Sequence, residues 1–140
     1  MKAEGLTFDV LLTSRLSRAI KTMWLATEQM GLMWLPAHKH WRLNERHYGA
    51  LQGSNKAEAV KKYGETQVKQ WRRGYATSPP RVERNSPDFP GADTRSAGGP
   101  HSALQRGMSL KDVLSRQMQH WNTDSLPTYE RAEHRVLAAQ

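Results

Sequence analysis

Apolar residues along the first third of the chain follow two different periods. Residues 8–14 form an apolar run typical of a buried strand, and the hydroxyls of Thr13 and Ser14 predict a cap for a following helix. The next apolar side chains recur every three to four positions and predict a helix over residues 15–29. Residues 33–41 predict a second strand. This succession indicates a strand-helix-strand unit.

The remainder of the chain predicts three more helices and a last strand. Helices are expected over 56–63, over 65–75, and from Ser109 onward, and a strand over 135–139. The apolar stripe of the third helix consists of Leu110, Val113, Leu114, Met118 and Trp121. Strands alternating with helices predict an α/β fold with a mostly parallel sheet flanked by helices.

Residues 77–107 interrupt this pattern. They contain five prolines and show little periodicity, which predicts a long Pro/Gly-rich loop or a disordered stretch. The helix predicted over 56–63 has a clear start, because Asn55 and Glu58 have the spacing of a capping box. We therefore expect one domain over residues 1–140 that contains one long loop.

Composition narrows the class of protein. The chain has 140 residues, of which 37% are hydrophobic, and its mean hydropathy is -0.79. No apolar run approaches the roughly 20 residues of a membrane span, so we expect no membrane partner. The first residues are too polar for a secretory signal, and cysteine is absent from the sequence. A cytoplasmic location is the expectation.

The net charge of +8 favours anionic partners. A diffuse basic surface would suit nucleic acid, whereas arginines that converge on one pocket would suit small phosphorylated molecules. The arginines lie within the segments that carry recognisable motifs, and a guanidinium group matches phosphate and carboxylate oxygens. We therefore favour a small-anion pocket and expect no nucleic-acid partner.

The stretch 41–53, WRLNERHYGALQG, has the most distinctive chemistry. The carboxylate of Glu45 is next to the fixed positive charge of Arg46, and His47 and Tyr48 follow. A cation can hold an anionic substrate while a neighbouring carboxylate moves a proton. Outside such a context, a Glu beside an Arg is usually a surface ion pair.

This string resembles the cofactor-dependent phosphoglycerate mutases, a branch of the histidine phosphatase superfamily. The resemblance extends through TSRLSRAIKT at 13–22, the stretch GSNKAE at 53–58 and WRRGY at 71–75. It is strong over 8–75, weak over 76–107 and strong again over 109–121. It implies part of a three-layer sandwich, phosphoglycerate mutase-like but incomplete.

The resemblance also implies roles for single residues. Glu45 matches the general acid/base of the family, and Arg18 matches the arginine that binds the phosphoryl group. The remaining anion-binding positions match Arg46, Tyr48, Lys56, Arg72 and Arg73. The implied reaction interconverts 3-phosphoglycerate and 2-phosphoglycerate in glycolysis through a phosphohistidine that is primed by the cofactor 2,3-bisphosphoglycerate.

Two motifs of the family are not found in this sequence, namely Arg-His-Gly and His-Gly-Asn-Ser. The expectation is therefore an incomplete mutase domain, inactive by itself as an isomerase. Bisphosphoglycerate mutase or phosphatase activity is an alternative, because it shares the motifs. A non-catalytic protein that binds anions, or that associates with its own copies or with an intact mutase subunit, is another.

Histidines and tryptophans suggest two further sites that we consider less favoured. His38 and His40 alternate along a predicted strand and His47 follows, but a metal site needs a suitably placed third ligand. A pair of surface histidines, with no metal, is the preferred interpretation. The five tryptophans are expected in the core or at subunit contacts, and not as a platform for stacking bases.

Overall fold

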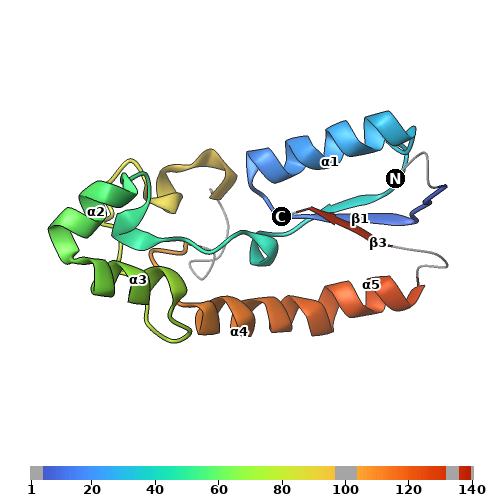
Figure 1. The fold of residues 1–140 in the computed structure, drawn as a ribbon. Helices are drawn as coiled ribbons and strands as arrows, with labels where there is room; N and C mark the ends of the chain where they lie inside the picture. Colours follow the sequence, from blue (N-terminus) through green and yellow to red (C-terminus); the bar gives the residue numbers. More distant parts are fainter. Residues whose placement is uncertain (1–4, 97–103, 132–135, 140) are drawn as a thin grey trace. The chain divides into compact units, whose positions relative to one another are not determined.

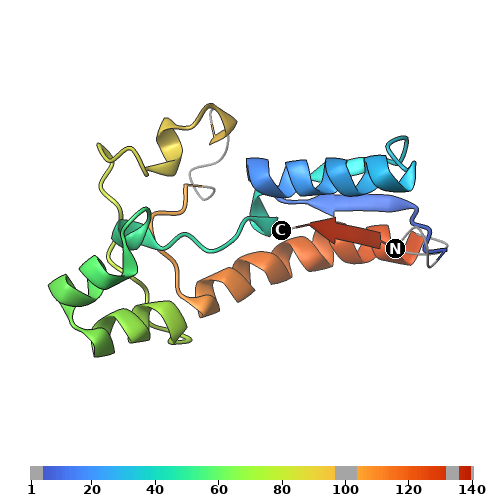
Figure 2. The same cartoon turned by 45° about the horizontal axis from the view of Figure 1, so that its top comes forward.

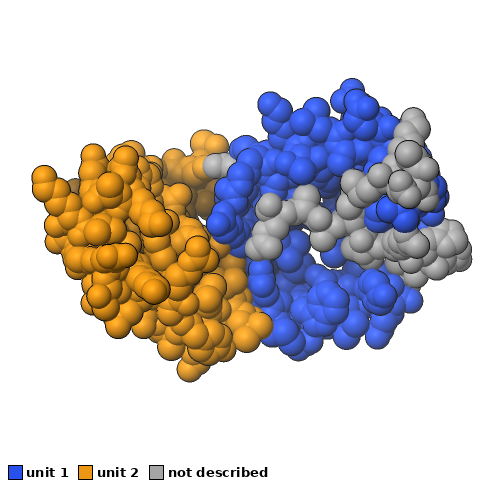
Figure 3. Space-filling model, viewed as in Figure 1, with its two compact units in different colours: residues 1–45, 117–140 blue, residues 46–116 orange. Residues whose placement is uncertain are grey.

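The fold consists of two compact units. A computed structural model describes residues 5–96, 104–131 and 136–139. The first unit comprises residues 1–45 and 117–140, and the second comprises residues 46–116 (Figure 3). We call them the sheet unit and the helical unit, after the elements that their described residues form, and describe each by itself.

The sheet unit contains a three-stranded parallel sheet. β1 (Val10–Thr13) lies between β2 (Ala37–Lys39) and β3 (Val136–Ala139). Leu11 pairs with Ala37 on one side and with Leu137 on the other. The predicted parallel α/β arrangement is thus confirmed, and β1, whose four residues are all buried, lies at its centre.

Helices cover both faces of this sheet. Figures 1 and 2 show α1 (Ser17–Met30) on one face and α5 (Leu126–Arg131) on the other. Leu11 packs with Met23 of α1, whereas the adjacent Leu12 lines a hollow beside the opposite helical segment. The side chains of successive strand residues therefore point to opposite faces of the sheet, as the two-residue period of a strand requires. This arrangement is consistent with part of a phosphoglycerate mutase-like fold.

The turn from β1 into α1 differs from its prediction. Leu16 is the N-cap of α1 and makes no side-chain capping bond, so Thr13 and Ser14 do not cap this helix. Both hydroxyl residues are instead fully buried. The backbone N–H of Arg15 donates to the Asn44 side-chain oxygen at 2.9 Å, which ties the turn to a distant segment. Helix α1 begins two residues later than predicted, after a turn in which the Leu16 N–H donates to the Ser14 hydroxyl at 3.3 Å.

β2 is shorter than the predicted strand over 33–41. A turn precedes it, in which the Leu35 N–H donates to the Leu32 carbonyl at 3.2 Å. After it the chain forms a short 3-10 helix, η2 (Trp41–Leu43). Trp41 is buried, as expected, whereas Trp34 is 75% exposed. Trp34 is therefore not a core residue, and a subunit contact stays the prediction for it.

The helical unit has its own small core. α2 (Lys56–Tyr63) has the predicted bounds, and the Asn55 side chain caps it by accepting from the Ala57 N–H at 2.8 Å. α3 (Glu65–Arg73) follows after Gly64 and ends two residues before the predicted end. The core is formed by Leu51, Ala59 and Val68, with Tyr48, Val60, Tyr63 and Trp71 packed against it. The described residues of this unit contain no strand.

The last long helix, α4 (Leu110–His120), begins with a local hydrogen-bond network. The Ser109 N–H and hydroxyl both donate to the Asp112 carboxylate, and these bonds hold the pKa of Asp112 below its usual value. The prediction of a helix is confirmed. Four of the five stripe residues are nevertheless exposed, namely Leu110, Leu114, Met118 and Trp121. Packing within the described structure does not cover them.

α4 continues into a wider turn before α5. This π-helical turn, η7 (Trp121–Ser125), closes with a bond from the Leu126 N–H to the Trp121 carbonyl. Pro127, the next residue, has no N–H and cannot continue the series of helical hydrogen bonds. Its position explains why the helix changes from α to π at this turn. None of the described helices combines the length and the apolar character that crossing a bilayer requires.

The stretch predicted as a long loop contains little regular structure. Within its described part, the helical elements are the short 3-10 turns η4 (Pro90–Ala92) and η5 (Thr94–Ser96). Hydrogen bonds nevertheless order it. The Ala50 N–H donates to the Pro80 carbonyl at 2.8 Å, and the Val82 N–H donates to the Arg106 carbonyl at 2.7 Å.

Gly49 and Gly31 form a matched pair for testing this packing. Both have positive φ, +60° and +71°, but a Cβ on Gly49 would lie 2.0 Å from the Pro80 carbonyl oxygen, whereas one on Gly31 meets no atom within 4 Å. Gly31→Ala should therefore cost about 1 kcal/mol of backbone strain. Gly49→Ala should destabilise its unit by about 3 kcal/mol or more. Urea denaturation of both variants measures this difference, and equal losses would contradict the close approach of Gly49 to Pro80.

Candidate functional site

The predicted site residues fall into two sets, because the boundary between the units follows Glu45. Arg18 and Glu45 belong to the sheet unit. Arg46, Tyr48, Lys56, Arg72 and Arg73 belong to the helical unit. Glu45 and Arg46 are consecutive in the sequence and lie on either side of this boundary.

In the sheet unit, backbone contacts bring the two predicted residues together. The His40 N–H donates to the Thr13 carbonyl at 3.0 Å, and the Asn44 side chain accepts from Arg15. These bonds fix the segment before Glu45 against the end of β1. Arg18, in the first turn of α1, then forms an ion pair with the Glu45 carboxylate. The sequence motifs TSRLSR and LNER thus meet at one end of the sheet.

The Arg18–Glu45 pair lies at the surface. The side chains are 59% and 48% exposed, so water screens their attraction and the pair stabilises the fold little. The arrangement therefore places one acid and one cation at an accessible surface, where a soluble anion can reach both.

In the helical unit, two arginines converge on the ring of Tyr48. The Arg46 guanidinium lies 4.6 Å from the ring centroid and that of Arg72 lies 5.5 Å from it. Arg46 also donates from Nη2 to the Arg72 carbonyl at 2.7 Å. Because Tyr48 packs against the core of this unit, the ring gives both guanidinium groups a fixed support. We call these three residues the arginine–tyrosine cluster.

Some donors of the cluster have no partner within the described structure. Arg46 is only 8% exposed, and its Nη1 and the Nε of Arg72 are buried without a hydrogen bond. None of the described carboxylates forms an ion pair with either arginine. Buried guanidinium donors are costly to leave unpaired. Two such groups beside each other suit an anion with several oxygens.

The two other predicted cations lie outside the cluster. Lys56 is the first residue of α2 and Arg73 is the last residue of α3, and both side chains are exposed. Adjacent helical residues point about 100° apart, which explains why Arg72 reaches Tyr48 while Arg73 faces solvent. Their roles stay predictions.

His47 is a functional candidate to which the sequence assigned no role. Its Nδ1 accepts the Gly49 N–H at 3.0 Å, and its Nε2 lies 3.2 Å from the Asp88 carbonyl oxygen. Burial lowers the pKa of His47, while the Asp88 backbone bond and carboxylate oppose this effect. The position of His47 within the ERHYG string was the one signal in the sequence that could have suggested a role. Its partner, Asp88, lies in the predicted loop, and no local pattern links the two residues.

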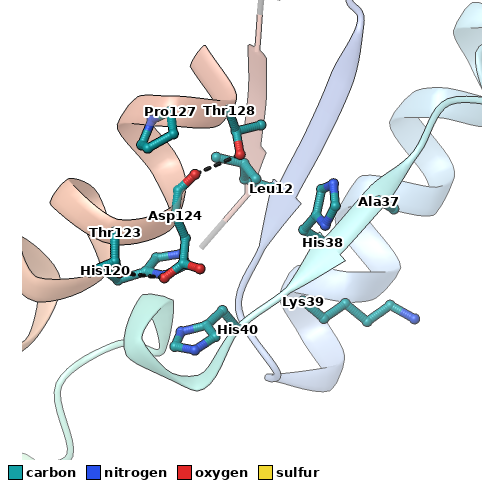
Figure 4. Close-up of a pocket in the computed structure, with 10 residues that line it drawn as sticks. All are labelled: Leu12, Ala37, His38, Lys39, His40, His120, Thr123, Asp124, Pro127 and Thr128. Carbon is teal, nitrogen blue, oxygen red and sulfur yellow. Dashed lines mark hydrogen bonds and ion pairs between the residues drawn. The ribbon is translucent and has the colours of Figure 1, made fainter. Parts of the chain in front are cut away.

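The sheet unit also contains a hollow of about 440 Å³ lined by histidines (Figure 4). The rings of His40 and His120 stack in parallel with their centroids 4.1 Å apart. The Nδ1 of His120 lies 3.0 Å from a carboxylate oxygen of Asp124. His38 lines the same hollow. Within the described residues, no group of three histidines or carboxylates is placed to hold a metal ion.

Burial and neighbouring charge keep His40 neutral. Its Nδ1 accepts the Arg42 N–H at 3.1 Å. Desolvation lowers the pKa of His40 from 6.5 to about 4, and the positive potentials of His120, Arg42 and Arg15 add to this, while Asp124 opposes it. The hydrogen bonds from Thr123 and His120 hold the pKa of Asp124 below its usual value. Sequence analysis missed this cluster because His120 and Asp124 lie far from His40 along the chain.

Comparisons with known proteins show the family to which this sequence is related. A family model described as the histidine phosphatase superfamily (branch 1) matches residues 2–88. The chain is 49% identical over 136 residues to a 2,3-bisphosphoglycerate-dependent phosphoglycerate mutase of Nitratidesulfovibrio vulgaris (strain DSM 19637 / Miyazaki F). The aligned part covers 97% of this chain and 54% of that protein. The chain therefore spans about half the length of the curated relative that it matches.

The stacked histidines predict an acid-sensitive sheet unit. The folded-state pKa of His40 lies below its ordinary value, so its contribution to stability is complete above pH 6.5 and is lost as the pH falls toward about 4. His40→Asn keeps an acceptor for the Arg42 N–H but cannot take up a proton. We expect the variant to lose less stability than the unmodified chain between these two pH values.

Tryptophan fluorescence during urea unfolding measures this difference, because Trp24, Trp34, Trp41 and Trp121 all lie in the sheet unit. His38→Asn is the matched control, since the exposed His38 lines the same hollow without stacking on His120. Equal acid sensitivity of the unmodified chain and His40→Asn would contradict the interpretation.

Proposed function

Since this chain belongs to the histidine phosphatase superfamily, branch 1, we propose that it binds phosphoglycerates for a phosphoglycerate mutase reaction. The reaction interconverts 3-phosphoglycerate and 2-phosphoglycerate. The observation that carries the proposal is the arginine–tyrosine cluster, where the buried Arg46 and the half-buried Arg72 lie beside one aromatic ring, each with a buried donor that has no partner within the described structure. The identity to a mutase along nearly the whole chain supports the same reaction.

The cluster suits a phosphate or carboxylate group for a physical reason. A buried cation without a counter-ion costs several kcal/mol of desolvation, at least in order of magnitude, which an anionic ligand offsets. Arg46 and Arg72 present planar groups of donors that match two oxygens of one anion. Tyr48 holds both guanidinium planes in place before the ligand arrives, so less entropy is lost on binding.

The same donors fit 2,3-bisphosphoglycerate as a cofactor. Its charged groups would accept hydrogen bonds from Arg46 Nη1 and Arg72 Nε, the buried donors of the cluster that have no partner within the described structure. When bound, this cofactor supplies a phosphoryl group for transfer. The residues of this chain bind and orient the anion, and the exposed Lys56 and Arg73 add positive potential at the ends of two helices.

Glu45 is the residue we propose to move protons. A carboxylate can accept or donate a proton at a substrate hydroxyl when it lies within hydrogen-bond reach. In the structure it accepts from Arg18, whose guanidinium would also attract a phosphoryl group. Competition of a substrate phosphate for Arg18 would free the Glu45 carboxylate for this task. A cytoplasmic location and association with further copies of the chain stay predictions.

Removing either arginine of the cluster should weaken anion binding. Arg46→Ala and Arg72→Ala each remove a charged hydrogen-bond donor, worth about 1.5–3 kcal/mol. The dissociation constant for 2,3-bisphosphoglycerate should therefore rise about 10- to 100-fold in each variant. Isothermal titration calorimetry on the 140-residue chain measures this constant. Arg72→Lys should recover only part of the loss, because an ammonium group cannot form two parallel bonds.

Arg84→Ala is the matched control, because Arg84 is exposed, lies in the same unit and carries the same charge. It should change the affinity little. Equal losses in Arg84→Ala and Arg72→Ala would mean that only net charge matters and would contradict a defined site. Unchanged affinity in Arg46→Ala would contradict the proposed role of the cluster.

A further inference from the structure

His47 joins three segments of the helical unit through three hydrogen bonds. Its Nδ1 accepts from the Gly49 N–H, its Nε2 meets the Asp88 carbonyl, and its own carbonyl accepts from the Met108 N–H at 3.1 Å. The segments around Asp88 and Met108 are separate in sequence from the motif. A single side chain and its backbone therefore connect the motif loop to two distant parts of the chain.

These contacts fix the protonation of the imidazole. A backbone N–H can only donate, so the Nδ1 that receives the Gly49 bond must carry a lone pair. A backbone carbonyl can only accept, so the Nε2 that meets Asp88 must carry the proton. The contacts thus select the neutral imidazole with its proton on Nε2. A second proton would place two N–H groups against each other and remove the Gly49 bond.

The bond to Gly49 lies next to the anion-binding residues. His47 lies between Arg46 and Tyr48 in the sequence. The conformation of its backbone therefore determines the positions of the Cα atoms from which the Arg46 and Tyr48 side chains extend. On the far side, Gly49 approaches the Pro80 carbonyl so closely that no Cβ fits between them. The loop is therefore fixed at Gly49 by backbone packing and at His47 by the imidazole.

We propose that His47 is a positioning residue, whose neutral imidazole holds the loop that carries Arg46 and Tyr48 in the conformation that binds a phosphate-bearing anion. This inference deepens the proposed function and rests on it. His47 itself touches no ligand in this account. Its loss, or its protonation, would allow the loop to move and would separate Arg46 from the ring of Tyr48 and the carbonyl of Arg72.

Burial and a neighbouring carboxylate act in opposite directions on the protonation of His47. Asp88 contributes both the accepting carbonyl and a carboxylate that favours protonation, while burial of the ring disfavours it. The segment before Met108 contains Arg106, whose Nε donates to the Val82 carbonyl at 2.8 Å. Protonation of His47 therefore acts against the bond from Gly49 and against the burial of the ring, whereas Asp88 favours it.

Two variants of His47 distinguish the loss of its hydrogen bond from the loss of its side-chain volume. His47→Asn places a side-chain oxygen near the position of Nδ1, where it can accept from Gly49, whereas His47→Ala offers no acceptor. We expect His47→Ala to bind 2,3-bisphosphoglycerate about tenfold more weakly at about pH 7.5, and His47→Asn to recover most of that affinity. His38→Asn, an exposed histidine of the sheet unit, is the matched control and should bind as the unmodified chain does.

The pH dependence of binding distinguishes a role of the neutral imidazole from a role in packing alone. Phosphate groups titrate near pH 6 themselves, so the quantity of interest is the ratio of the dissociation constants of the unmodified chain and His47→Asn. That ratio should rise as the pH falls from about 7.5 through the acid range in which His47 takes up its second proton, because only the unmodified chain protonates at this position.

Each outcome decides the matter. If the unmodified chain binds and His47→Ala binds equally well, or the ratio stays constant with pH, the positioning role is overturned while the proposed function stands. If His47→Asn binds as weakly as His47→Ala, acceptance from Gly49 is not the cause and the inference is also overturned. Failure of the unmodified chain to bind would refute the proposed function and this inference together.

Discussion

The contact of two guanidinium groups with the ring of Tyr48 is the interaction on which the site depends. Tyr48 packs against the core of the helical unit and at the same time faces Arg46 and Arg72. The small core of Leu51, Ala59 and Val68 therefore does more than stabilise its unit, since it determines where two positive charges lie. The unpaired donors are tolerated because the surrounding packing holds them, and this is common where a site is prepared for a ligand.

The irregular stretch after Tyr75 helps to hold the loop that carries Arg46 and Tyr48. Its prolines and glycines prevent regular helices and strands, but its carbonyl groups remain available to the motif loop. Pro80 accepts from Ala50, Asp88 accepts from His47, and the close approach at Gly49 requires a residue without a side chain. A segment with no periodicity thus fixes the backbone of the most distinctive motif in the sequence.

Sequence analysis predicted the regular elements well where periodicity was strong. The parallel sheet, the bounds of α2 and the existence of α3 and α4 followed from apolar spacing and the Asn55 cap. It was wrong about the cap of α1, because Asn44 acts from a distant part of the sequence, and about the length of β2, because a local turn closed by the Leu35 N–H precedes the strand and apolar spacing does not encode it. The convergence of Arg46, Tyr48 and Arg72 agrees with the family motifs, whereas the stacking of His40 on His120 joins residues with no local pattern.

The most direct test of the central claim is an NMR titration of the chain with 2,3-bisphosphoglycerate, observing the Arg72 Nε–H and the ring protons of Tyr48. The account predicts that both signals shift together and saturate at one ligand concentration, because one anion occupies the buried donors beside the ring. Binding that leaves both signals unchanged, while exposed lysine and arginine signals shift without saturation, would contradict it.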